Sequence, residues 1–295
     1  MKPAEFEERE YEASLYNQLA TGDRRVWSPG QVFEAHVGFD HALFTTDVWL
    51  FRLHGYRSYL PGTVLARYLW PQLWFRRRTP RALPTFRLNL FIQAKRPLWG
   101  RRAPASVRAK GLGHLFWRFD IDREQQAALG KVAAKLKGRA LVVYAAPAFH
   151  QHSALWLHTC RGTIVPNSTF PSVVVLGGHE AWYYTEPGAR GVANPDPTAM
   201  DEPSLSDRMD QLLAGGVEAT ESWRRELTEL GLSIHDALAE EALGPTSRLA
   251  AFFGLLRQFR SDVDGLEESD VLFAFLTIVA FSEVFLVDWY VLGPP

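Results

Sequence analysis

Strand-like and helix-like segments alternate in the middle of the chain, and this order restricts the fold more than any other feature. Residues 86–95, 114–121 and 141–145 are rich in the aromatic and branched apolar residues typical of strands. The last two flank residues 122–136, where good helix formers follow an acidic first turn. Because a sheet needs helices to cover its apolar faces, this order predicts an α/β fold with a mixed β-sheet flanked by helices.

The C-terminal third has a different pattern, with helical periodicity throughout. Helices are predicted over residues 206–214, 218–230, 233–242, 246–261 and 267–290. A stretch rich in Gly, Pro, Asn and Asp at residues 187–197 marks a boundary before them. We expect an α/β domain over residues 1–200, with a basic and aromatic insertion near 54–85. Residues 201–295 are expected to form an all-α domain for partner binding or oligomerisation.

The last apolar run, residues 271–292, is long enough to span a bilayer. Glu283 and Asp288 interrupt it, and no cluster of Lys or Arg flanks it. We therefore expect a buried core or oligomerisation helix, with a membrane-associated protein as the alternative. The first 20 residues are acidic and lack the apolar stretch of a secretory signal, so the expected location is cytoplasmic.

The net charge of −1 hides a separation of charge along the chain. Residues 48–119 contain 15 Lys and Arg and no Asp or Glu, whereas the segments on either side are net acidic. A block this basic attracts polyanions by Coulomb attraction and counterion release. The single cysteine, Cys160, excludes a disulfide framework. The histidines at positions 150, 152, 158 and 179 match no usual zinc spacing and are expected to be ordinary residues.

Four polar residues stand in a pattern suited to phosphodiester hydrolysis: Glu34, Asp40, Gln93 and Lys95. Gln93 and Lys95 are two residues apart in a predicted strand and therefore project from the same face. Burying an ammonium without a partner is unfavourable, so a carboxylate is expected near Lys95. Oxygen ligands from Asp40, Glu34 and Gln93 suit Mg²⁺ or Mn²⁺, while Lys95 would orient a water or stabilise phosphate charge. The alternative is a surface salt bridge between Lys95 and Asp40.

The pattern Glu34-x-x-x-Gly-Phe-Asp40, followed by Gln93-Ala-Lys95, resembles the PD-(D/E)XK nuclease superfamily, in particular the Mrr-like restriction endonucleases. The resemblance covers roughly residues 26–160. It implies a restriction-endonuclease-like core, the four residues as a catalytic set, and a polar helix residue at Gln125 or Gln126. The 53-residue step from Asp40 to Gln93 exceeds the spacing usual in the family, and it requires the insertion near 54–85. By analogy, the resemblance implies a role in bacterial antiviral defence or restriction.

Arginines and aromatic residues are interleaved in the basic block. Arginine contacts phosphate and aromatic rings stack on bases, so the expected partner is nucleic acid, with DNA as the first candidate. The residues assigned to this contact are Arg76, Arg77, Arg78, Arg96, Arg101 and Arg102. The pattern thus indicates a metal-dependent nuclease. The alternative is a nucleic-acid-binding or scaffold subunit that has the fold without the activity.

Overall fold

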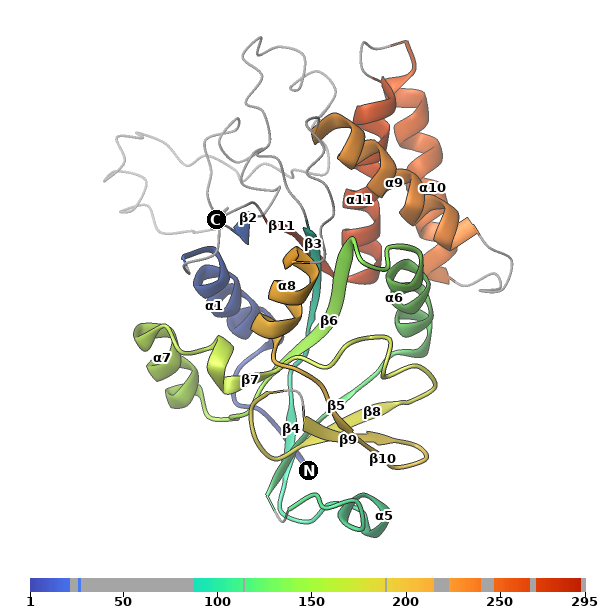
Figure 1. Cartoon of the computed structure of the whole chain (residues 1–295). Coiled ribbons are helices and arrows are strands. Elements are labelled where there is room, and N and C mark those ends of the chain that lie inside the picture. Colours follow the sequence, from blue (N-terminus) through green and yellow to red (C-terminus); the bar gives the residue numbers. More distant parts are fainter. Residues whose placement is uncertain are drawn as a thin grey trace, which may run out of the picture. The chain divides into compact units, whose positions relative to one another are not determined.

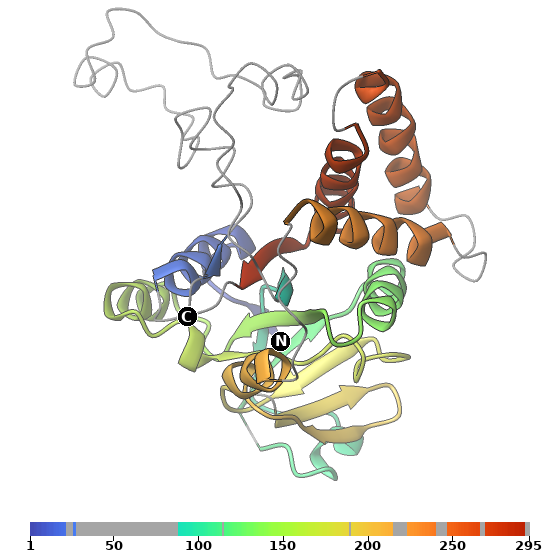
Figure 2. The ribbon, with the colours of Figure 1, turned by 45° about the horizontal axis from the view of Figure 1, so that its top comes forward.

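A computed structural model describes residues 1–21, 26–27, 88–113, 115–188, 190–214, 223–239, 247–265 and 269–292. All of these belong to one compact unit of the chain. Figures 1 and 2 show its helices and strands in two orientations. The predicted insertion near residues 54–85 lies outside the described residues.

A five-stranded mixed sheet contains the strand that bears Gln93. The central strand, β3 (Leu88–Ala94), pairs in parallel with β6 (Ala140–Pro147) on one side. On the other side it pairs antiparallel with β11 (Asp288–Leu292), with Asp288 opposite Ile92. Two-residue strands, β2 (Val26–Trp27) and β7 (Ser168–Thr169), complete the order β2-β11-β3-β6-β7. The predicted α/β class and the mixed sheet are therefore confirmed.

Helices cover both faces of this sheet, because the apolar residues of β3 alternate between them. Leu90 and Ile92 pack in one core with Tyr11 and Leu15 of α1 (Glu8–Thr21). Phe91 points to the opposite face and meets Phe281 of α11 (Ser269–Phe285) edge to face. Helix α6 (Arg123–Lys135) lies on this second face too, since its first turn contacts Gln93. Figure 2 shows α1 and α6 on opposite sides of the strands.

A second, antiparallel sheet of six strands has the order β1-β4-β5-β8-β9-β10. Its strands are β1 (Lys2–Pro3), β4 (Leu98–Gly100), β5 (Phe116–Asp120), β8 (Ala181–Tyr184), β9 (Arg190–Asn194) and β10 (Thr198–Asp201). The strands β5 and β6, predicted at 114–121 and 141–145, thus lie in different sheets, and α6 connects the two sheets. The basic segment at residues 98–113 contains β4 and a short helix, α5 (Ala105–Arg108). Buried Ala103 and Val107 anchor it.

Helices predominate after residue 204: α8 (Leu205–Ala214), α9 (Trp223–Ala239), α10 (Ser247–Val263) and α11. The separate helices predicted at 218–230 and 233–242 are one helix, α9. The helix predicted at 267–290 ends at Phe285, where Leu286 takes a left-handed conformation with φ of 52°. Strand β11 follows, so the prediction of an all-helical segment is wrong at residues 288–292. This end of the chain joins the mixed sheet.

The membrane alternative concerned the apolar run that the structure divides between α11 and β11. Helix α11 has 17 residues, fewer than the roughly 20 that a bilayer crossing needs. In the described ranges, none of the helices has the length and apolar character required for a transmembrane span.

Two short helical segments, α7 (His152–Arg161) and the 3-10 helix η2 (Val165–Asn167), lie between β6 and β7.

Candidate functional site

Lys95 lies directly after the last residue of β3, at the end of the parallel β3–β6 pair. Its backbone N–H donates to the carbonyl of Ala145 at 2.8 Å, so the ladder to β6 extends to Lys95 itself. Polar groups at the carboxyl ends of parallel strands are commonly positioned for ligand binding, because the loops that follow leave room there. The backbone around Lys95 is thus fixed by sheet hydrogen bonds on its β6 side.

Gln125 brings the side chains of Gln93 and Lys95 together. Asp122 begins α6 by accepting a hydrogen bond from the Gln125 backbone N–H at 2.8 Å, which places Gln125 in the first turn. Gln125 Oε1 then accepts from Lys95 Nζ at 3.0 Å. Its Nε2 donates to Gln93 Oε1 and to the carbonyl of Phe285, the last residue of α11. The structure therefore joins Gln93 and Lys95 through one helix residue, Gln125.

The two glutamines of this chain of hydrogen bonds are buried, with exposed fractions of 2% for Gln93 and 1% for Gln125. Buried amides are costly unless their hydrogen bonds are satisfied. The resemblance pointed to Gln125 or Gln126 as a polar helix residue near the site. The contact with Lys95 is made by Gln125, whereas Gln126 binds the Tyr144 hydroxyl and the carbonyl of Val173.

The Lys95 ammonium lies in a largely buried environment with charges of both signs around it. Burial lowers the pKa of Lys95, and the charge of Arg248 lowers it further, although Glu8 and the nearby Asp122 and Asp120 oppose the shift. Its Nζ is 5.6 Å from the ring centroid of Tyr144. Within the part of the chain that the structure describes, no carboxylate forms an ion pair with Lys95. An ammonium that is held but not neutralised can donate to an anionic oxygen.

The other predicted members of the site, Glu34 and Asp40, lie outside the described residues, as do Arg76, Arg77 and Arg78. Gln93 Oε1 already accepts from Gln125, but an amide oxygen has two lone pairs and can accept a second partner. Over the described ranges, no three side chains of His, Cys, Asp or Glu are grouped to hold a metal ion.

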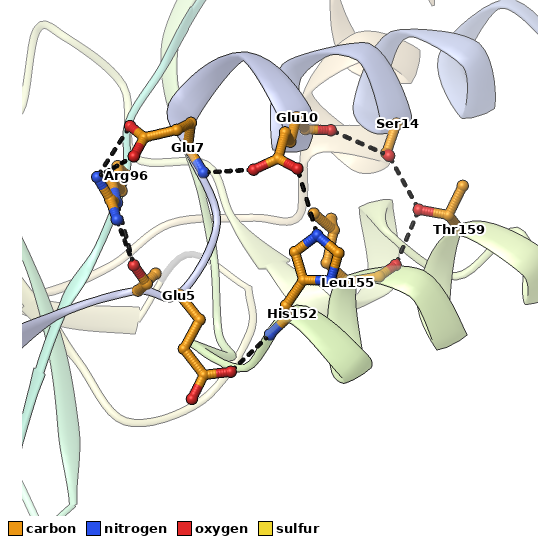
Figure 3. A network of polar contacts seen from close by, with 9 residues as sticks. Glu5, Glu7, Glu10, Ser14, Arg96, His152, Leu155 and Thr159 are labelled. Atoms are coloured by element: carbon orange, nitrogen blue, oxygen red, sulfur yellow. Dashed lines mark hydrogen bonds and ion pairs between the residues drawn. The ribbon is translucent and has the colours of Figure 1, made fainter.

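Arg96, one of the predicted nucleic-acid contacts, forms hydrogen bonds and an ion pair with other residues of the chain (Figure 3). Its guanidinium forms an ion pair with Glu7 at 2.9 Å and donates to the carbonyl of Ala4. The same network joins α1 to α7, because His152 contacts Glu10 at 3.2 Å. Arg96 therefore fastens the β3–β4 connection to the N-terminal segment. Arg101 and Arg102, by contrast, are exposed between β4 and α5.

Glu12 and Asp288 form a pair of acidic residues on the α1 side of the mixed sheet, and the sequence did not predict this pair. The Tyr16 hydroxyl binds both Glu12, at 3.0 Å, and Asp288. Burial raises the pKa of Glu12 to about 7, and the neighbouring Asp288 and Glu8 raise it as well. The only sequence signal was Asp288, which interrupts the apolar run near the C-terminus.

The chain was compared with protein-family models, curated proteins and solved structures, and none of the three comparisons found a match.

Proposed function

We propose that the protein is a metal-dependent nuclease that hydrolyses phosphodiester bonds, with DNA as its substrate, and that Lys95 is its catalytic lysine. The observation that carries the proposal is the setting of Lys95 at the end of β3. Its ammonium donates to buried Gln125, and no described carboxylate forms an ion pair with it. A cation held in this way can stabilise the negative charge that develops on a phosphate.

The proposed roles follow from the donor types. Lys95 donates a hydrogen bond to a non-bridging phosphate oxygen or orients the attacking water. Asp40, Glu34 and the free lone pair of Gln93 Oε1 supply hard oxygen ligands, which suit Mg²⁺ or Mn²⁺. A bound divalent ion would lower the pKa of its water and offset phosphate charge. With one neutral ligand in the set, millimolar metal is expected to be needed.

The test is cleavage of plasmid DNA by the whole chain in millimolar Mg²⁺ or Mn²⁺. Lys95→Ala and Asp40→Ala should each lower the cleavage rate by about 100-fold or more. Lys135→Ala is the matched control, because Lys135 is an exposed lysine on α6. Equal cleavage by the wild type and Lys95→Ala proteins would contradict the proposed role of Lys95.

A second candidate is a nucleic-acid-binding or scaffold subunit without catalytic activity. It is favoured by the internal use of Gln93, whose amide bonds to Gln125 and to the carbonyl of Ala94. It predicts salt-sensitive binding of DNA, no cleavage in either metal, and no effect of Lys95→Ala on affinity. Cleavage and DNA binding by the wild-type and Lys95→Ala proteins therefore distinguish the nuclease from the non-catalytic subunit.

The biological setting that we propose is a bacterial defence or restriction system, and this step is by analogy with nucleases of the same motif. Helices α9 to α11 are the proposed site of a protein partner or of self-association. A pull-down from infected and uninfected cells tests this proposal. The wild type is compared with a variant in which a surface residue of α9 is changed, such as Leu232→Glu. Leu232 of α9 is an apolar side chain that is 53% exposed.

A further inference from the structure

About half of the arginines in the described chain pair with a carboxylate, as Arg96 does with Glu7, Arg118 with Asp120 and Arg139 with Glu226. Arginines without an ion pair to a described residue occur singly on α1, α7 and α10. On or beside the β4–α5 segment and β9, by contrast, five basic residues without such a pair occur together. We call this group the cationic face, and it consists of Arg101, Arg102, Arg108, Lys110 and Arg190.

The backbone under the cationic face is fixed by packing. Gly100 admits no side chain, since a Cβ there would lie 2.8 Å from the Phe116 ring. Buried Ala103 and Val107 lie between the basic residues of this segment and share a core with Phe116. The charged side chains are thus carried on a platform of buried residues.

Two members of the cationic face lie together beside the antiparallel sheet. Lys110 and Arg190 line one open cleft of about 320 Å³, together with Thr185. Two carboxylates, Glu186 and Asp201, line the same cleft, and neither forms an ion pair with Lys110 or Arg190. Within the cleft the charges of the two signs balance, whereas residues 101–110 add three arginines and no acidic residue.

We propose that the cationic face binds the phosphate backbone of duplex DNA beyond the position of Lys95. Arginine and lysine without carboxylate partners release counterions when they bind phosphates, which is the main source of sequence-independent affinity. Arg101 follows Lys95 by six residues, so their Cα atoms are at most about 22 Å apart. That distance is about six to seven base pairs of B-form DNA. The proposal rests on the proposed function, which makes nucleic acid the partner.

The experiment measures the affinity of the whole chain for a fluorescent DNA duplex at several NaCl concentrations, in EDTA so that cleavage cannot interfere. The variants are Arg101→Gln/Arg102→Gln and Lys110→Gln/Arg190→Gln. Each pair should weaken binding about 10-fold or more and lower the slope of log K against log salt by about 1 to 2. The control is Lys135→Gln/Lys137→Gln, which removes the same charge at exposed positions at the end of α6.

Equal affinity and slope for the control and for either folded variant pair would overturn the proposal. So would a wild-type chain that does not bind the duplex. Failure of the proposed function has a different signature, because the wild type would then bind the duplex through the cationic face and leave it uncleaved in Mg²⁺ and Mn²⁺. Circular dichroism shows which variants are folded. Two pairs are used so that a decisive variant remains if one fails to fold.

Discussion

The Gln125 side chain makes hydrogen bonds with three groups at once, so its removal should lower both the stability and the activity of the protein. Gln125→Leu keeps the approximate volume but leaves Gln93 Oε1, the Phe285 carbonyl and the Lys95 ammonium without this partner. Buried groups left without hydrogen bonds cost about 1–3 kcal/mol each, so a loss of at least about 2 kcal/mol in unfolding free energy is expected. Urea denaturation measures it.

The control for this prediction is Gln151→Leu. Gln151 is exposed at the start of α7 and its side chain makes no capping hydrogen bond, so a change within about 0.5 kcal/mol is expected. If Gln125 also positions Lys95, the Gln125→Leu protein should cleave more slowly with an altered pH profile. A merely structural role would leave the pH profile of the surviving activity unchanged.

Glu12 should make the stability of the protein depend on pH near neutrality. Burial and Asp288 raise the pKa of Glu12 to about 7 from its ordinary 4.5. The folded state then binds more protons than the unfolded state between these values, so the free energy of unfolding should fall as pH rises through this window. The stabilising contribution is complete below about pH 4.5 and is lost above about pH 7.

Glu12→Gln should remove that dependence and stabilise the protein at pH 8 by about 1 kcal/mol, a figure reduced for the partial solvent exposure of Glu12. Thermal unfolding followed between pH 5 and pH 8 measures the slope. Glu283→Gln is the control, since Glu283 is exposed on α11 and should leave the slope as it is. A wild-type stability that rises across this window would contradict the assignment.

At the scale of elements, the contact between α9 and α11 depends on one glycine. A Cβ at Gly231 would lie 2.6 Å from the backbone carbonyl oxygen of Ala274, so even alanine cannot be accommodated without moving a helix. Gly231→Ala should therefore destabilise the protein by about 1–3 kcal/mol through overpacking. Gly130→Ala on α6 has open space and should stabilise by up to about 1 kcal/mol. Chemical denaturation of the two variants should give shifts of opposite sign.

The local sequence pattern predicted those elements whose residues are typical of only one kind of secondary structure. Strand β3 and helix α6 match the predicted segments 86–95 and 122–136, since an apolar run and a capped run of helix formers are strong local signals. Strand β11 was missed because Asp288–Leu292 continues the apolar run of α11, and the left-handed turn at Leu286 has no glycine to announce it. That Gln93 and Lys95 project from one face could be predicted from their spacing, whereas the hydrogen bond from Gln125 to the Phe285 carbonyl could not.

At the scale of the whole molecule, the strand near the C-terminus completes the mixed sheet by contacts with segments far away in the sequence. Strand β11 pairs with β3 and β2, while Tyr16 of α1 binds Asp288. These contacts join residues separated by more than half of the sequence, and no local pattern encodes such pairings. The α/β class was therefore predictable, but the pairing that completes the sheet was not.

Because β11 lies between β2 and β3, its removal should affect the fold as a whole. Strand β11 buries Trp289, Tyr290 and Val291, and the Trp289 indole donates to Asn89 at 3.0 Å. Loss of three large buried side chains corresponds to about 5 kcal/mol or more, comparable with the total stability of many domains. It would also expose β3 as an unprotected edge strand.

A chain ending at residue 285 should therefore lose its cooperative thermal transition and aggregate, as measured by circular dichroism and light scattering. A chain ending at residue 292 keeps β11 and should melt like the full chain, which controls for the truncation itself. If β11 were only an appended strand, the shorter chain would still unfold cooperatively, with a lower Tm. Loss of cooperativity would instead mean that the end of α11 belongs to the same folding unit as Lys95. The two are already linked in the structure, because Gln125 binds both the Phe285 carbonyl and the Lys95 ammonium.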